Sequence, residues 1–366
     1  MKVVFKLVIT LVVLLVLYFS FWPVSVSPQA WQAPPPVPLE GDYAANDLLS
    51  DLQAIPLDGL HGPEAVIDDG NGTAYTATHD GWVLRWEAEA VSPIPERWVD
   101  LGGRPLGMAF DADGSLWVAN AYTGLQKVTP TGDVTLELES VDGVRLGFAD
   151  DLDITSSGII YLSDASTKFS PVEFGGTLEA SLLDVNEQGM HGRVIEYSIA
   201  TGEARVVMDG LTFANGVAIS EDESFFYVAE TGKYRLWRYW LSGENAGQSE
   251  VVIDNMPGFP DNIHTGRDGR FWLGFTSPRS EPLDALAAYP ALRKAMQRLP
   301  ASVRPNVQVY AHIVIIDSAG QIVRSFQDPN KQYEASTGAW ETDNYVYVGS
   351  LTAPVLARYT KAQLGL

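Results

Sequence analysis

The stretch Phe148–Asp164, FADDLDITSSGIIYLSD, sets an acidic pair and a short apolar strand before a polar turn and a strand of aromatic and β-branched residues. A polar turn between two such strands is typical of a β-hairpin. The same turn and second strand recur along the chain, in segments 68–78, 111–120, 155–164, 220–230, 266–275 and 341–350. A repeat of about 40–50 residues indicates a propeller. The sequence therefore predicts an all-β, six-bladed β-propeller over residues 41–366.

Closure of this propeller should involve both ends of the repeat region. An open ring of blades would leave strand edges exposed, so one blade is expected to combine strands from the two ends. The segment APVLARYT (353–360) has strand character and follows the sixth hairpin. We expect it to complete one blade together with residues around 42–60.

Two insertions interrupt the even spacing of the repeats, at 167–191 and 278–305. The second contains PLDALAAYPALRKAMQRL, whose periodicity predicts an amphipathic helix that is broken or bent at Pro290. A helical insertion on a propeller loop is expected to form a lid or a wall over one mouth. The alternative is that it packs on the rim without a function.

The N-terminus is a separate segment. Residues 1–22 hold the apolar run Leu7–Trp22 after Lys2 and Lys6. This favours an uncleaved membrane anchor, with a cleaved signal as the alternative. The two lysines place the N-terminus in the cytoplasm and the propeller on the extracytoplasmic side. Residues 23–40 are rich in proline and are expected to form an extended, semi-rigid linker.

Composition excludes several classes of function. The 366 residues include 24 Lys and Arg against 46 Asp and Glu, a net charge of −22 that would repel nucleic acid. There is no cysteine, which rules out disulfides, thiolate zinc sites and a cysteine nucleophile. The sequence also lacks a Gly-x-Ser-x-Gly elbow, a P-loop and a dinucleotide fingerprint.

A candidate site follows from the register of the repeats. The residues eight positions before each turn should start the innermost strands and surround the central channel: Glu64, Leu106, Asp150, Asn215, Asp261 and Ser336. Four of them carry oxygen ligands, the donors that Ca²⁺ or another hard divalent cation prefers, and none is a histidine. The alternative is that Asp and Asn only form turns before strands.

Apolar residues adjoin this ring and are expected to shape a substrate pocket. They are Phe148, Phe213, Phe259 and Trp340, and the pocket is expected to include the ring residues Leu106 and Ser336 as well. Packing between blades is an equally good explanation of the aromatic residues. Among the histidines, His61 and His191 lie best for a channel mouth but are expected to be structural, and His79 is expected only to open a turn.

The segments RPLGMAFD, FADDLDITSSGIIYLSDAS, GLTFANGVAIS, RYWLSGENAG and PGFPDNIHTGRDGRFWLG closely resemble the strictosidine synthase-like family. More distantly the chain is similar to paraoxonases and to the gluconolactonase/senescence-marker family. The resemblance implies a catalytic Ca²⁺ held by Glu64, Asn215 and Asp261, with Asn262 as a further ligand. Asp150-Asp151 stands where these relatives carry an Asn-Asp pair.

Two departures from the relatives bear on the reaction. The place of the glutamate that plant strictosidine synthases use as acid/base matches Thr337, and the place of a paraoxonase histidine matches Leu106. The gluconolactonase route, in which an aspartate takes the proton from water, survives with Asp261 as the base. The resemblance thus implies a calcium-dependent hydrolase of small carboxylic esters or lactones.

Two other classes of function stay open at this stage. One is a non-enzymatic, membrane-anchored binding propeller, because the propeller fold does not fix function. The other is an enzyme that condenses an amine with an aldehyde. The natural substrate and the oligomeric state cannot be read from the sequence.

Overall fold

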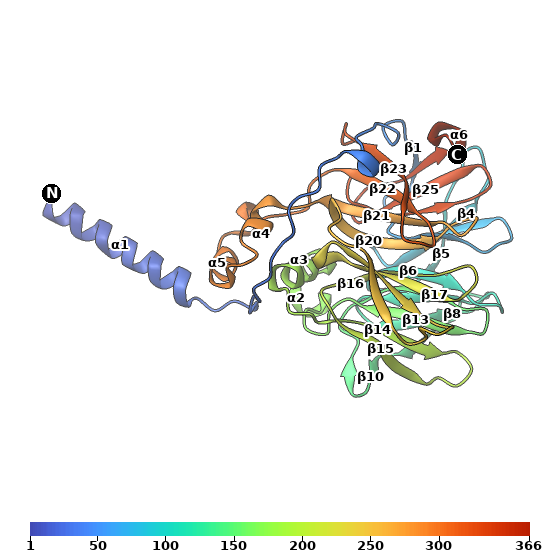
Figure 1. The fold of residues 1–366 in the computed structure, drawn as a ribbon, viewed down its shortest axis with the longest axis horizontal. Coiled ribbons are helices and arrows are strands. Elements are labelled where there is room, and N and C mark those ends of the chain that lie inside the picture. Colours follow the sequence, from blue (N-terminus) through green and yellow to red (C-terminus); the bar gives the residue numbers. More distant parts are fainter.

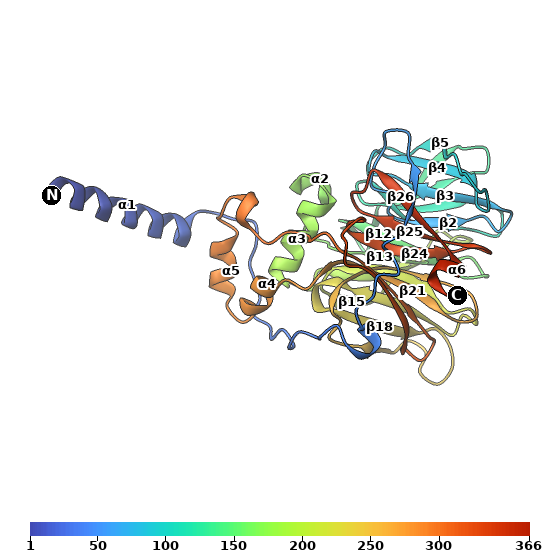
Figure 2. The same cartoon turned by 90° about the horizontal axis from the view of Figure 1, so that it is seen from above.

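Six four-stranded antiparallel sheets surround a central channel in the computed structural model, which describes residues 1–366. An isolated apolar helix projects from one side of this disc, and four short helices lie between the two (Figures 1 and 2). The predicted six-bladed β-propeller is confirmed.

Each of the first five blades is continuous in sequence. Blade one is β2 (Val66–Asp68), β3 (Thr73–Ala77), β4 (Trp82–Glu87) and β5 (Glu96–Asp100); blade two is β6 (Pro105–Phe110), β7 (Leu116–Asn120), β8 (Gly124–Val128) and β9 (Val134–Leu138). Blade three is β12 (Ala149–Ile154), β13 (Ile159–Asp164), β14 (Gly192–Ser198) and β15 (Ala204–Leu211); blade four is β16 (Ala214–Ile219), β17 (Phe225–Glu230), β18 (Arg235–Trp240) and β19 (Ser249–Ile253). Blade five is β20 (Gly258–Thr265), β21 (Phe271–Pro278), β22 (Ala311–Ile316) and β23 (Ile322–Asp328).

The sixth blade closes the ring with strands from both ends of the chain. It contains β24 (Ser336–Glu341), β25 (Tyr345–Ser350), β26 (Val355–Thr360) and β1 (Gln53–Pro56). β1 pairs with β26 through Gln53↔Arg358 to Pro56↔Val355, as closure by residues 353–360 and 42–60 predicted. Arg358 is fully buried and both Nε and Nη2 donate to Gln53 Oε1, at 3.0 and 2.7 Å.

Helices belong to the N-terminus, the insertions and a few short turns. The N-terminal helix is α1 (Lys2–Phe21); the first insertion carries α2 (Pro171–Phe174) and α3 (Thr177–Glu187), and the second carries α4 (Glu281–Ala285) and α5 (Pro290–Met296). The remaining elements are α6 (Lys361–Leu364), the hairpin β10 (Ser140–Val141) and β11 (Val144–Arg145), and the 3-10 turns η1 (Gly41–Tyr43), η2 (Thr231–Lys233) and η3 (Ala301–Val303). Pro290 begins α5, because proline is accommodated in the first turn of a helix but not in its interior.

The core lies between neighbouring blades. Ile67 and Tyr75 of the first blade, for example, share one buried cluster with Met108 and Val118 of the second. α1 differs, since none of its residues is buried, and it is long and apolar enough to cross a membrane. The chain therefore has an N-terminal helix suited to membrane association and a propeller held together by contacts between its blades.

Candidate active site in the central channel

The innermost strands share a defect at the channel. Pairing shifts register between Pro105 and Met108 in β6, and at the matching places 149/152, 214/217, 260/263 and 336/339 in β12, β16, β20 and β24. Such a bulge bends the strand and redirects side chains. Each bulge has two residues outside the regular pairing, and these include most of the candidate residues.

The first residue of four of these bulges faces one cavity. Leu106, Asp150, Asn215 and Asp261 line it together with Glu64, which precedes β2. The cavity has a volume of about 310 Å³. The structure therefore brings together four of the five residues that were predicted as metal ligands.

The second residue of the bulge packs against the neighbouring blade instead. A Cβ on Gly107 would lie 2.5 Å from Asp151 Cα, and one on Gly216 would lie 2.6 Å from Asp261 O, so glycine permits the close approach of the blades. Asp151 accepts the backbone N–H of Val217 at 3.0 Å and thereby links blade three to blade four. The acidic pair thus divides its roles, with Asp150 at the cavity and Asp151 between blades.

Asn262 occupies the same second position. It is fully buried, does not line the cavity, and neither amide atom has a hydrogen-bond partner. A Cβ on Gly338 of the next blade would lie 3.1 Å from its Cβ, which places Asn262 against blade six. Its expected role as a metal ligand has no contact in this arrangement to support it.

The register of the sixth blade differs from the one predicted by counting back from the turn of each repeat. The turn between the paired residues Glu341 and Val346 is one residue shorter than the turn between Phe110 and Leu116. Counting back from the turn therefore reached Ser336, whereas the first bulge residue is Thr337. Ser336 accepts the backbone N–H of His312 at 3.0 Å and lies outside the cavity wall.

Burial and mutual repulsion act on the acidic residues. Glu64, Asp150 and Asp261 are 2–4% exposed. Burial raises the pKa of Asp150 well above its usual range, and the carboxylates of Glu64 and Asp261 raise it further. Burial and then Glu64 likewise raise the pKa of Asp261, although the Asn215 amide opposes this by donating to Asp261 Oδ1 at 2.5 Å. This cluster of three carboxylates therefore favours a partner that neutralises part of its negative charge.

Arg104 supplies part of that neutralisation and was missed by the sequence analysis. Its guanidinium is 1% exposed and forms an ion pair with Glu64 Oε2 at 2.5 Å, while Nη1 donates to Gly62 O at 2.8 Å. Burial raises the pKa of Glu64, and the Arg104 charge opposes this. Arg104 lies two residues before the register position, so no spacing rule pointed to it.

Three oxygen atoms remain without hydrogen-bond partners at the cavity: Asp150 Oδ1, Asn215 Oδ1 and Asp261 Oδ2. Buried oxygens normally have partners, so these three point to a missing cation or donor. As they stand, no three His, Asp or Glu side chains are grouped closely enough to hold an ion. The donor chemistry fits a hard cation, provided that the Arg104–Glu64 and Asn215–Asp261 contacts loosen.

The rest of the cavity wall is largely apolar. Phe148, Phe213 and Phe259 line it beside Leu106. Trp340 does not, because its indole N–H donates to Asp68 Oδ2 at 2.8 Å and its ring packs between blades. Both insertions contribute to the wall, with Leu178, Leu182 and Val185 from the first and Ser280, Leu283 and Pro305 from the second.

The histidines differ from expectation in one case. His79 lines the cavity, because the turn after β3 lies beside the start of blade two. Burial, and then the Arg104 charge, lower its pKa to about 4, so the ring is neutral at neutral pH. His61 pairs with Asp80 at 3.0 Å on the rim, and His191 binds Glu187 at 2.8 Å.

Comparisons with known proteins identify the family. The family descriptions that match are "Strictosidine synthase" over residues 150–244 and "Strictosidine synthase-like, N-terminal" over residues 41–86. The adipocyte plasma membrane-associated protein of Salmo salar is 33% identical over 359 residues, covering 91% of this chain and 83% of the relative. The chain belongs to the strictosidine synthase-like family. The strictosidine synthase-like 3 protein of Arabidopsis thaliana is also 33% identical, covering 89% of each chain.

Solved structures share the fold of this strictosidine synthase-like chain. A gluconolactonase from Xanthomonas campestris superposes with a TM-score of 0.61 at 17% identity, covering 85% of this chain and 90% of the other. A calcium-binding protein, regucalcin, from Agrobacterium tumefaciens gives 0.56 at 15% identity, covering 84% and 93%. At such identities the likeness establishes the propeller alone.

Proposed function

We propose that the chain is a calcium-dependent hydrolase of carboxylic esters or lactones. The observation that carries this proposal is the set of three unpartnered oxygens, from Asp150, Asn215 and Asp261, at one buried cavity with apolar walls. A family that includes enzymes, and propeller neighbours described as a gluconolactonase and a calcium-binding protein, support it.

Ca²⁺ would be held in the channel cavity by Glu64, Asp150, Asn215 and Asp261. A bound cation supplies charge that polarises the ester carbonyl and stabilises the oxyanion formed from it. Arg104 offsets one of the three carboxylates, so the four side chains and the guanidinium together carry a charge that a divalent ion balances.

Asp261 is the proposed general base. Asn215 and Asp261 would hold the ion once the hydrogen bond between them loosens, and Oδ2 of Asp261, which has no hydrogen-bond partner, can accept a proton from water. Leu106, Phe148 and Phe213 exclude bulk water from the reacting bond, which strengthens electrostatic interactions there. The chain's own residues thus position the water, remove its proton and shield the bond.

The test measures calcium binding and hydrolysis separately. Isothermal titration of the chelator-treated protein should show one calcium site, which Asn215→Ala weakens. Turnover of aryl esters and lactones should require calcium and should fall at least a hundredfold in Asp261→Asn, with a smaller loss of affinity. Asp268→Asn, in an exposed turn of the same blade, is the matched control. Unchanged turnover in Asp261→Asn would refute the catalytic role.

The condensation of an amine with an aldehyde is not proposed. Thr337 is fully buried, and its hydroxyl donates to the carbonyl of Glu64 at 2.5 Å, so this position offers no acid or base. A propeller that only binds its ligand would keep ligand affinity and show no turnover in the same assay.

We also propose that α1 anchors the chain in a membrane with the propeller on the extracytoplasmic side. The helix is long and apolar enough to span a membrane, and Lys2 and Lys6 lie before its apolar run, which begins at Leu7. Protease added outside sealed, right-side-out vesicles should digest the propeller and spare α1. Protection of the propeller from the protease would contradict the proposed orientation and place the propeller on the cytoplasmic side.

A further inference from the structure

Residues 24–37 run along the helical insertions and contact them, with Val26 and Pro28 buried. We call this segment the strap. Val26 of the strap is fully buried in a cluster with Leu106, Phe148 and Phe213, three residues of the cavity wall. Farther along, the backbone N–H of Trp31 donates to Ala287 O at 3.2 Å. The segment predicted as a linker therefore packs, through Val26, behind residues of the cavity wall.

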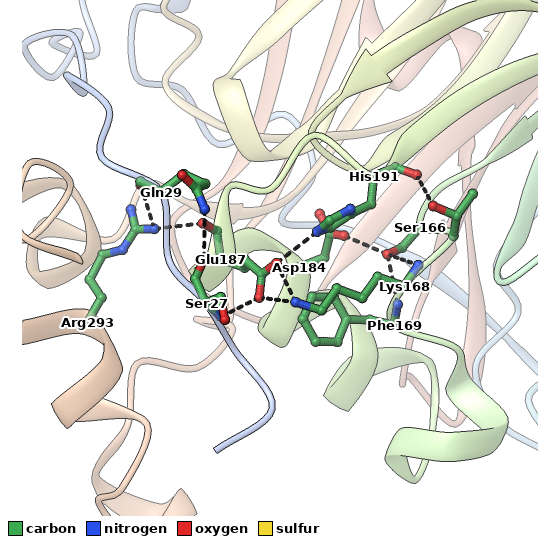
Figure 3. Close-up of polar contacts among 10 residues, drawn as sticks. Ser27, Gln29, Ser166, Lys168, Phe169, Asp184, Glu187, His191 and Arg293 are labelled. Carbon is green, nitrogen blue, oxygen red and sulfur yellow. Dashed lines mark hydrogen bonds and ion pairs between the residues drawn. The ribbon is translucent and has the colours of Figure 1, made fainter. Parts of the chain in front are cut away.

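Glu187, at the end of α3, is the main attachment point of the strap (Figure 3). Its carboxylate accepts the backbone N–H of Ser27 at 2.6 Å, and also bonds Lys168 at 2.6 Å and His191 at 2.8 Å. Its carbonyl accepts the backbone N–H of Gln29 at 2.8 Å. One residue thus joins the strap to both ends of the first insertion.

Two arginines join the strap and the end of α1 to the second insertion. Arg293 of α5 donates to Gln29 O at 3.1 Å and to Glu187 O at 3.0 Å (Figure 3). Arg298, just after α5, donates to Phe19 O at 2.8 Å and to Trp22 O at 2.7 Å. The C-terminal end of α1 is therefore held directly against the helices that wall the cavity.

A second cavity opens between these helices. Its volume is about 470 Å³, within the range of about 300–1,000 Å³ usual for small-molecule sites. Its wall begins at Val24 and Ser25 of the strap and continues over apolar residues of the insertions: Phe174, Leu178, Leu182, Leu183, Leu283, Met296 and Ala301. It shares Leu178, Glu179, Leu182, Leu283, Pro305 and Asn306 with the channel cavity.

Beside its apolar residues, the wall of the second cavity holds one acidic and one basic side chain, Glu179 and Arg304. Arg304 lines the second cavity, its buried Nε has no hydrogen-bond partner, and it forms no ion pair with any Asp or Glu. A buried donor without a partner is costly, so a ligand that brings an anionic group here would be stabilised.

We propose that the second cavity binds a single-chain anionic amphiphile, of the long-chain fatty acid type, that comes from the membrane in which α1 lies. Its alkyl chain occupies the space between α3 and α5, and its carboxylate meets Arg304. This inference rests on the proposed anchor and extends the proposed hydrolase, because the second cavity shares six wall residues with the channel cavity and its wall begins at Val24, three residues after α1 ends. Binding itself needs no hydrolysis.

The test uses the full chain in phosphatidylcholine nanodiscs and a palmitate analogue with a photoreactive group near the chain end. Labelled peptides identified by mass spectrometry should come from segments 171–187 and 290–305. Unlabelled palmitate should compete for labelling, whereas octanoate should not, because its short chain fills little of the cavity and stays largely in water rather than in the bilayer. Labelling confined to α1, or competition independent of chain length, would overturn the proposal.

Variants separate the cavity from the surface. Leu183→Trp fills the second cavity and should reduce labelling at least fivefold, as should Met296→Trp on the opposite wall if the first variant does not fold. Leu292→Trp, at a position that is 52% exposed on the same insertion, is the matched control. Arg304→Gln should weaken competition by palmitate more than competition by its methyl ester. Wild-type labelling in both cavity variants would refute the site, whatever the outcome of the hydrolysis assay.

Discussion

Replacing Arg104 by methionine tests whether the channel is built around an ion. Arg104 and Glu64 are 1% and 3% exposed, and their ion pair is the only one that reaches the candidate ligands. Removing one partner of a buried pair costs about 3–5 kcal/mol, since the other charge stays buried without compensation. We therefore expect Arg104→Met to lower the free energy of unfolding by about this amount in the presence of a chelator.

Calcium should reverse part of this loss. A cation bound only by the folded state adds about 2.7 kcal/mol at a concentration a hundred times its dissociation constant. Because the variant frees Glu64 from Arg104, its calcium affinity should exceed that of the wild type, and the gap in stability should narrow at saturating calcium. Glu64→Gln in the same chain removes the unpaired charge and should recover most of the stability without calcium.

Denaturant unfolding of the detergent-solubilised chain, with chelator or with calcium, measures these differences. Arg205→Met is the control, because Arg205 and Glu196 pair bidentately at an exposed site and should contribute at most about 1 kcal/mol with no response to calcium. An Arg104→Met protein as stable as the wild type, or one equally destabilised with and without calcium, would refute a cation site formed by Glu64.

Three further outcomes concern the strap and the closure of the ring. Burial tends to raise the pKa of Glu187, but its hydrogen bonds to His191, Lys168 and Ser27 outweigh this and lower it to about 2. The stabilisation of the strap by Glu187 is therefore complete above the unfolded-state pKa of about 4.5 and is lost as the pH falls toward 2. Hydrogen exchange of residues 24–31, corrected for intrinsic rates, should accelerate over that pH range in the wild type. The acceleration should be much smaller in Glu187→Gln. Deleting residues 1–17, which keeps the partners of Arg298, should leave exchange in the insertions almost unchanged, whereas deleting 1–40 should accelerate it, and equal exchange in the two deletions would contradict a structural strap. Ending the chain before Ala353 removes β26 and the partner of β1, so cooperative thermal unfolding by calorimetry should disappear; an unchanged melting curve would argue against closure by these strands.

The blades could be predicted because each repeat carries its own turn and alternating strand, and closure followed from the need to cover strand edges. The residues around the channel could also be predicted, but only in the blades whose turns have the same length. Ser336 was placed one residue early because the sixth turn is shorter, which no residue type reveals. Arg104, which reaches Glu64, and His79, which reaches the cavity, were missed because both extend from loops where side-chain direction depends on how two blades meet.

The bulges explain how one repeat can serve both packing and chemistry. A regular strand directs alternate side chains to the two faces of its sheet, and in a propeller both faces pack against neighbouring blades. By displacing two residues, four of the five bulges direct their first residue to the cavity and place the next against the adjacent blade, as Asp150 and Asp151 show. Where the backbone of the adjacent blade comes close to that next residue, it is glycine, at 107 and 216. The first bulge position is thereby free to change chemically, from Leu106 to Asn215 to Asp261, while the second position packs against the next blade.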